Sequence, residues 1–173
     1  MTKGGARAPP SMPACSPFSS SSGITGTYTY SSSTGDLTLS GVNIATLANG
    51  NYCFHNVTLG NSTQLKVNGL VVIKMTGVLN TSGSTNLNNT TQIPSNLRIL
   101  SSYSGSNGVI IGNSVSVYAL IYSPKTGLNL SGSAPLFGTA AAKTLTIGNS
   151  GAIHYDTQLK TIWPAIWTLI FGP

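Results

Sequence analysis

Residues 108–156 read GVIIGNSVSVYALIYSPKTGLNLSGSAPLFGTAAAKTLTIGNSGAIHYD, and their apolar runs end at similar turns. The tripeptide GNS occurs at 60–62, 112–114 and 148–150, and SGS follows the apolar runs that end near Leu79 and Leu130, at 82–84 and 131–133. The turns therefore begin at positions 60, 82, 112, 131 and 148, and the interval between 82 and 112 is the longest. A period of about 17–22 residues that holds several short strands predicts a β-solenoid, in which strands of successive coils pair in parallel.

The rest of the chain supports an all-β fold. Its apolar runs alternate with period two and are bounded by Gly, Asn or Ser, and no segment has a helical period. Residues 122–132 align with 139–149, with Leu128 over either Leu145 or Thr146, which is a one-residue ambiguity. An antiparallel sandwich also has short strands, but it gives no reason for the same tripeptide to return at strand ends. We therefore predict a single-domain parallel β-solenoid.

The expected organisation has three parts. Residues 1–23 are rich in Pro, Ser and Gly and predict a flexible arm. Residues 24–160 form the solenoid, and the long interval between the turns at 82 and 112 is expected to contain a loop around TQIPSNLRI. Residues 161–173 are an apolar tail, too short to span a bilayer, which needs about 20 residues.

Charge is scarce in this chain. Charged residues make up 6% of it, against about 25% in an average globular protein. The net charge of +6 reflects two acidic residues against eight basic ones, and the basic residues are scattered. No basic run or aromatic–basic motif suggests a nucleic-acid partner, and no motif suggests a cofactor.

Two long segments carry a family resemblance. They are LANGNYCFHNVTLGNSTQLKVNGLVVIKMTGVLNTSG (47–83) and the stretch from NLRIL to GAIHYD (96–156). In order of motifs, they resemble a bacterial surface domain found in pilus-associated proteins, similar in architecture to bactofilin-type polymer-forming proteins. The resemblance covers roughly residues 45–158, and it implies a β-solenoid rather than a defined biochemical activity. The tail after Tyr155 differs from the usual ending of that family.

The strongest catalytic candidates are His154 and Asp156, which alternation places on one face of a strand. Residues two apart on a strand are about 7 Å apart, which is too loose to define a catalytic pair. Solenoid enzymes that cleave polysaccharides need clustered carboxylates. The only acidic residues, Asp36 and Asp156, are 120 positions apart. We therefore predict no enzyme activity and interpret GAIHYD as the last coil of the repeat.

Cys15 and Cys53 are the only cysteines. They could form one disulfide, which would fit an oxidising compartment, or remain two free thiols. His55 lies two residues from Cys53, but no second Cys/His pair completes a metal site, so none is predicted.

Two sets of residues are candidates for assembly. Asparagines at the recurring turns are expected to form a side-chain amide ladder between coils: Asn61, Asn113 and Asn149. Apolar residues of the tail are expected either to cap the last coil or to dock on another subunit: Ile162, Trp163, Ile166, Trp167, Leu169, Ile170 and Phe171.

Two functions follow as hypotheses. The first is a self-assembling subunit of an extracellular or cell-surface filament, a homopolymer joined by end-to-end stacking and tail docking. The second is a surface-display or adhesion module that accompanies a pilus or another cell-envelope component and does not polymerise.

Overall fold

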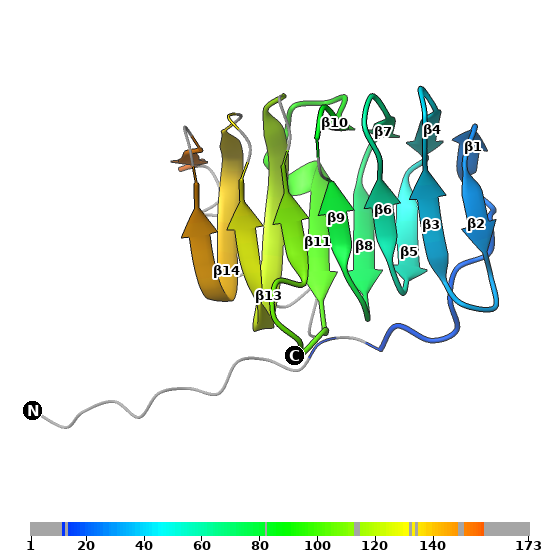
Figure 1. Cartoon of the computed structure of the whole chain (residues 1–173), viewed down its shortest axis with the longest axis horizontal. Coiled ribbons are helices and arrows are strands. Elements are labelled where there is room, and N and C mark those ends of the chain that lie inside the picture. The colour runs from blue at the N-terminus through cyan, green and yellow to red at the C-terminus, as the bar shows by residue number, and fades with distance from the viewer. Residues whose placement is uncertain are drawn as a thin grey trace, which may run out of the picture.

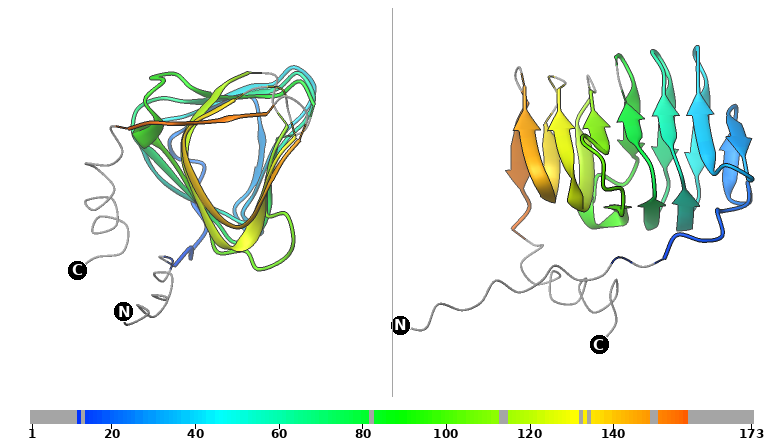
Figure 2. Two further views of the ribbon diagram at one scale, coloured as in Figure 1. Left: turned by 90° about the vertical axis from the view of Figure 1, so that its left-hand side faces the viewer. Right: turned by 60° about the horizontal axis from the view of Figure 1, so that its bottom comes forward.

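The computed structural model describes residues 12, 14–81, 83–112, 115–131, 133, 135–148 and 151–157. In this part the chain winds as a parallel β-solenoid of about six coils, stacked side by side along the long axis of the molecule (Figure 1). Viewed down that axis, the coils enclose a triangular core (Figure 2). The predicted fold is confirmed.

In the described residues, the first three coils contribute strands to three faces, and the later coils contribute strands to the first and third faces only. The first face stacks β3 (Asp36–Leu39), β6 (Val57–Leu59), β9 (Leu79–Thr81), β12 (Val109–Ile111) and the second halves of β13 (Val117–Leu130) and β14 (Leu136–Ile147). The second face stacks β4 (Ile44–Leu47), β7 (Gln64–Val67) and β10 (Asn86–Asn89). The third face stacks β5 (Gly50–Phe54), β8 (Val71–Met75), β11 (Leu97–Ser101), the first halves of β13 and β14, and β15 (Ile153–Tyr155).

The described residues of the recurring turns each follow a first-face strand: 60–62 after β6, Gly83 after β9, Gly112 after β12, Ser131 after β13 and Gly148 after β14. Backbone bonds tie each turn to the preceding coil: the Gly60 N–H donates to the Leu39 carbonyl at 2.9 Å, and the Gly148 N–H donates to the Leu130 carbonyl at 2.9 Å. Equal positions of successive coils therefore stack directly, and this is why the same small turn returns.

Inward side chains form continuous apolar columns. On the first face, paired positions place Leu37, Val57, Leu79, Val109 and Leu128 one above another, each at most 1% exposed. Period-two alternation creates this arrangement, because successive strand residues point to opposite faces.

Coil length varies for local reasons. The register pairs Leu128 with Leu145, which settles the one-residue ambiguity at a spacing of 17, whereas Tyr118 pairs with Phe137 at a spacing of 19. The difference arises at an irregularity between Ser123 and Gly127. The long interval between the turns at 82 and 112 contains the expected loop, which includes a short 3-10 helix, η1 (Pro94–Asn96).

Candidate functional sites at the two ends of the solenoid

Two strands of opposite direction close the N-terminal end of the solenoid. β1 (Ile24–Gly26) pairs antiparallel with β4, and β2 (Thr29–Ser31) pairs antiparallel with β3. These strands occupy the outer edges of the first coil on the first and second faces. Every other strand pairing in the described residues is parallel, so this reversal marks the end of the stack.

The segment before β1, which includes Cys15 and Ser19, covers the remaining outer edge of the first coil, that of β5 on the third face. The Ser19 N–H donates to the Cys53 carbonyl at 3.0 Å, and the Cys53 N–H donates to Ser19 Oγ at 2.7 Å. A disulfide joins Cys15 to Cys53 in the same place. The end of the predicted flexible arm that precedes β1 is therefore bonded to the first coil. All three outer edges of the first coil, those of β3, β4 and β5, are covered. We call residues 15–31 the N-terminal cap.

Aromatic side chains fill the space beneath the cap. Tyr52 stacks on Phe54 with ring centroids 5.9 Å apart, and Tyr30 meets Phe54 edge-on at 5.7 Å. The Tyr52 hydroxyl donates to the backbone carbonyls of Gly23 and Ala48, at 2.9 Å each. Burial raises the pKa of Tyr52, although the bond to Ala48 acts in the opposite direction. These aromatic contacts and hydrogen bonds anchor the cap to the first coil.

The outer side of the cap bears a shallow, open groove of about 530 Å³. It is lined by hydroxyl-bearing side chains and one glycine: Ser20, Ser21, Gly26, Tyr28, Tyr30 and Ser32. The Tyr28 hydroxyl already donates to the Ile24 carbonyl at 3.3 Å, and the Tyr30 hydroxyl donates to the Ser19 carbonyl. The side chains that line the groove therefore carry hydroxyl groups, and none of them is a Lys, Arg, His, Asp, Glu or Cys.

An asparagine bridges three coils at the corner between the third and first faces. Asn56 Nδ2 donates to Asp36 Oδ1 at 2.8 Å in the preceding coil, and Asn56 Oδ1 accepts the Val78 N–H at 2.8 Å in the next coil. The Asn56 N–H also donates to Asp36 Oδ1 at 3.2 Å. Burial alone would raise the pKa of the Asp36 carboxyl, but hydrogen bonds from Thr34 and Asn56 lower it below its usual value.

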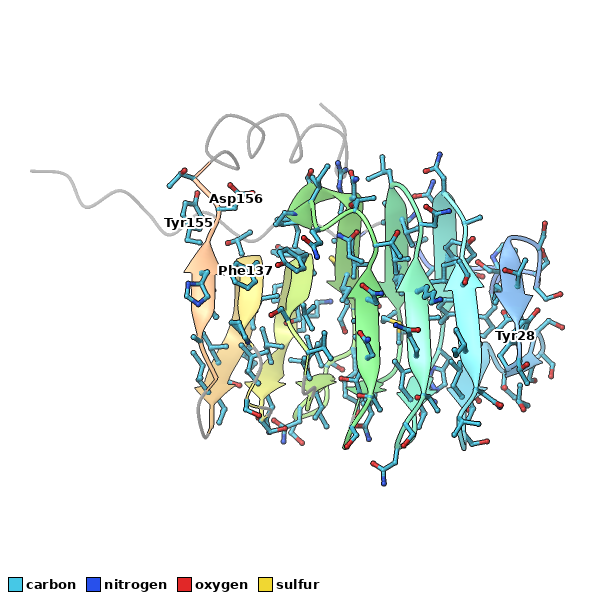
Figure 3. All side chains as sticks on the ribbon, turned by 90° about the horizontal axis from the view of Figure 1, so that it is seen from above. Tyr28, Phe137, Tyr155 and Asp156 are labelled. Atoms are coloured by element: carbon cyan, nitrogen blue, oxygen red, sulfur yellow. A yellow bond between two sulfur atoms is a disulfide. The ribbon has the colours of Figure 1, made fainter. Side chains whose placement is uncertain are left out.

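The C-terminal end contrasts with the capped end. Leu145 and Ile147 of β14 are 49% and 45% exposed, although they continue the inward columns of Leu128 and Leu130. Within the described residues, nothing pairs with the outer edge of the last coil. Figure 3 shows Phe137, Tyr155 and Asp156 at this end and Tyr28 at the other.

Stacked rings line the third face near the open end. The Tyr118 and Phe137 rings are 4.9 Å apart, and the Phe137 and His154 rings are 4.7 Å apart, both nearly parallel. The register places these three residues at one position of successive coils. Within the described residues, His154 is thus the end ring of an aromatic stack.

With the geometry established, comparison with known proteins places the chain in a family. A family model described as a domain of unknown function, DUF7305, matches residues 21–162. The chain belongs to the DUF7305 family. No curated protein and no solved structure matches the chain.

The acidic residues of this DUF7305 domain do not come together. Asp36 lies in the first coil, whereas the Asp156 N–H donates to the Gly138 carbonyl of β14 at 3.3 Å, near the other end. Five stacking steps separate β3 from β14 (β3, β6, β9, β12, β13, β14). At about 4.8 Å a step, the levels of β3 and β14 are roughly 24 Å apart, and Asp156 follows β15, which lies beyond β14 in the stack. A glycosidase pair needs roughly 5–10 Å between its carboxyl groups.

The other predicted site residues have varied outcomes. Cys53 is held in the disulfide, and His55 Nδ1 lies 3.1 Å from Thr76 Oγ1. In the described part of the DUF7305 domain, no three His, Cys, Asp or Glu side chains gather as metal ligands. No helix found there is long and apolar enough to cross a bilayer.

Of the three asparagines in the predicted turn ladder, only Asn61 lies within the described residues. Asn61 faces Gly83 of the next coil, and its Oδ1 occupies the place where a Cβ on that glycine would stand. Asn113 and Asn149 lie outside the described residues, as do the seven apolar tail residues named above. The bridging asparagine that the structure does show, Asn56, is at a different corner. Its only sequence signal is Gly77 one coil later, which leaves room for its side chain.

Proposed function

We propose that this DUF7305 domain is a non-catalytic structural module of the cell surface or extracellular space, a rigid rod that displays its lateral faces and does not lengthen by end-to-end stacking. Of the two functions expected from the sequence, this is the display module rather than the filament subunit. The single observation that carries the proposal is the closed N-terminal end.

A filament of stacked solenoids needs an open edge at both ends of every subunit. In this chain, an incoming C-terminal coil would have to displace β1 from β4 and β2 from β3. It would also have to displace the segment around Ser19, which the disulfide holds in place on β5. Head-to-tail growth is therefore opposed at every edge of the first coil.

The disulfide and the outward residues support a surface role. Structural disulfides persist in oxidising compartments. The first face presents one uncharged outward column along the rod, in which paired positions are Thr38, Thr58, Asn80, Ile110, Asn129 and Thr146. A flat, neutral face of this kind suits contact with a neutral partner more than with nucleic acid. A pilus or cell-envelope component remains the proposed class of partner.

Removing the cap from a folded chain tests the proposal. A protease site inserted in the exposed turn at 32–34 would cut between β2 and β3. In the cut, oxidised protein the disulfide still holds the cap, and we expect the same single species as in the uncut chain by sedimentation velocity. Reducing the disulfide and washing away residues 1–33 should then give concentration-dependent association.

The cut, oxidised protein is the control that retains the cap, and the uncut protein treated with the same reductant controls for loss of the disulfide alone. Fibres or ladders of oligomers in the uncut chain would favour the filament function instead. A reduced, cap-free protein that stays monomeric while folded would show that the cap does not limit assembly.

A further inference from the structure

The groove on the outer side of the N-terminal cap has the composition of a recognition surface. The residues that line it are of three types only: tyrosine, serine and glycine. Tyrosine offers a large, rigid and amphipathic contact area at a small entropy cost, whereas serine and glycine give adaptable hydrogen bonding, which is why binding loops are enriched in these types. The volume of about 530 Å³ is that of a small-ligand site.

The two tyrosines of the groove are fixed by the chain around them. Tyr28 and Tyr30 are two residues apart in extended backbone, which puts them on one side, and both pack against the apolar core. The Tyr28 hydroxyl donates to the Ile24 carbonyl at 3.3 Å, and the Tyr30 hydroxyl donates to the Ser19 carbonyl. The rings are therefore held in place before a ligand arrives, and their oxygens can still accept hydrogen bonds.

A glycine keeps the backbone of the groove close to the first coil. Gly26 has a φ of 98°, and a Cβ there would lie 2.2 Å from the Ile44 carbonyl oxygen of β4. Only glycine adopts this conformation and this close approach without strain. Gly26 thus ends β1 and turns the chain towards Tyr28 without adding a side chain to the groove.

The serines supply hydroxyl groups that the fold does not use. Ser21 and Ser32 are exposed, and no hydrogen bond in the described part of the chain involves either side chain. Ser20 is exposed as well, and its Oγ accepts the Ser22 N–H at 3.3 Å. Each serine hydroxyl both donates and accepts, so Ser21 and Ser32 can bond to a ligand without breaking any contact of the cap.

The lining selects a class of ligand. It contains no charged side chain that could pair with a charged ligand, and no aliphatic side chain that could surround a hydrocarbon. A peptide strand is disfavoured, because β1 and β2 have three residues each and such short edge strands are poor templates for pairing. A neutral sugar fits both parts of the groove: its C–H face suits a tyrosine ring, and its hydroxyls suit the serines.

We propose that this groove binds a neutral oligosaccharide, with one sugar ring against Tyr28 and its hydroxyls bonded to Ser21 and Ser32. The site lies at the capped end of the rod, where Figure 3 shows Tyr28. The inference deepens the proposed function by naming a neutral glycan as the partner, and it rests on that function only for the location at the cell surface. Because the groove is shallow and open, we expect a Kd of roughly 0.1–10 mM.

A titration of the full, oxidised chain tests the site. The probes are neutral tetrasaccharides of glucose, mannose and N-acetylglucosamine, with tetragalacturonate as the acidic comparison, and backbone amide shifts report binding. We expect saturable shifts within residues 20–32 for at least one neutral probe, and an affinity for the acidic probe at least about tenfold lower. No saturable shift for any neutral probe up to about 20 mM, or equal binding of the acidic one, would overturn the proposal.

Variants locate the site. Ser21→Ala/Ser32→Ala removes two hydroxyls without breaking a bond of the fold, and it should weaken binding roughly tenfold while the denaturation midpoint stays the same. Tyr28→Leu keeps an apolar side chain against the core but removes the ring, and it should weaken binding by a similar factor. The control is Thr58→Val, which removes an exposed hydroxyl of the first face. Binding that is weakened by Thr58→Val and not by the serine variant would place the sugar on the lateral face and contradict the groove.

The outcomes separate this inference from the proposed function. A chain that stays one species and binds no neutral probe would overturn the groove alone. A chain that forms fibres while residues 20–32 still respond to the sugar would overturn the display module alone.

Discussion

Replacing Asn56 by alanine removes a side chain that bridges three coils. Its two side-chain hydrogen bonds, each 2.8 Å long, reach Asp36 in one direction and the Val78 N–H in the other. The backbone bond from the Asn56 N–H to Asp36 remains in the variant. The change therefore isolates the amide bridge without removing any apolar contact of the core.

The expected loss follows from the two bonds. A hydrogen bond to a charged group contributes about 1.5–3 kcal/mol, and a neutral one about 0.5–1.5 kcal/mol. Because Asn56 and Asp36 are only partly buried, the values near the lower ends apply, and the free energy of unfolding should fall by about 2–3 kcal/mol. In a chain of this size, that lowers Tm by roughly 4–12 °C.

The assay is denaturant unfolding followed by circular dichroism, with Asn129→Ala as the matched control. Asn129 is an outward, partly buried residue of β13, and its replacement should change the free energy of unfolding by less than about 0.5 kcal/mol. If Asn56→Ala is as mild as Asn129→Ala, the bridge does not stabilise the stack and the reasoning is wrong.

Three further predictions concern the cap and the coils. The Cys15–Cys53 disulfide closes a loop with a sequence separation of 38. On the chain-entropy model, the free energy of unfolding of the Cys15→Ser/Cys53→Ser variant should be lower by about 4 kcal/mol. An unchanged denaturation midpoint would contradict the bonded cap. A Cβ on Gly138 (φ 136°) would lie 2.1 Å from the Ala119 carbonyl oxygen, whereas one on Gly41 (φ 65°) meets nothing within 4 Å. In thermal unfolding, Gly138→Ala should therefore lower the free energy of unfolding by about 3 kcal/mol or more, and Gly41→Ala by about 1 kcal/mol. Equal losses in the two variants would count against the close stacking at Gly138. The pKa of Asp36 is lower in the folded chain than in the unfolded one, because the effect of its hydrogen bonds outweighs that of burial. Its carboxylate therefore stabilises the fold above about pH 4. This contribution is lost as the pH falls through the folded-state pKa. Asp36→Asn should flatten the loss of Tm in acid, and parallel curves for the two proteins would refute this role.

Much of the solenoid can be predicted because its structure is periodic. The five turns that begin at 60, 82, 112, 131 and 148 follow the first-face strands from β6 to β14, and the spacing between the last two equals the stacking register that pairs Leu128 with Leu145 on that face. Period-two alternation identifies the inward columns. The sequence alone does not decide whether Leu128 aligns with Leu145 or with Thr146. The reason is that the irregularity between Ser123 and Gly127 adds residues that no local pattern distinguishes from a regular strand.

The N-terminal cap is harder to predict. The run TGTYTY predicts β structure, but alternation is the same in parallel and antiparallel strands, so it cannot show that β1 and β2 reverse direction. The pairing of Cys15 with Cys53 depends on where the segment before β1 lies in space. Composition therefore predicted a flexible arm where the structure has a bonded edge.

The bridge at Asn56 could not be identified from spacing alone. Asparagine is frequent throughout the chain, and the recurring GNS turns draw attention to another corner. Only the register shows that Asp36, Asn56 and Val78 meet. His154 gives the converse lesson: its proximity to Asp156 in sequence suggested chemistry, whereas stacking on Phe137 gives its ring a structural place.

Sedimentation velocity of the full, oxidised chain across a wide range of concentrations, with electron microscopy of the same samples, tests the central claim most directly. A solenoid closed at its N-terminal end by β1, β2 and the disulfide should remain one species of constant sedimentation coefficient and appear as short single rods. Fibres whose length increases with concentration and whose subunits repeat at the length of one solenoid would contradict it.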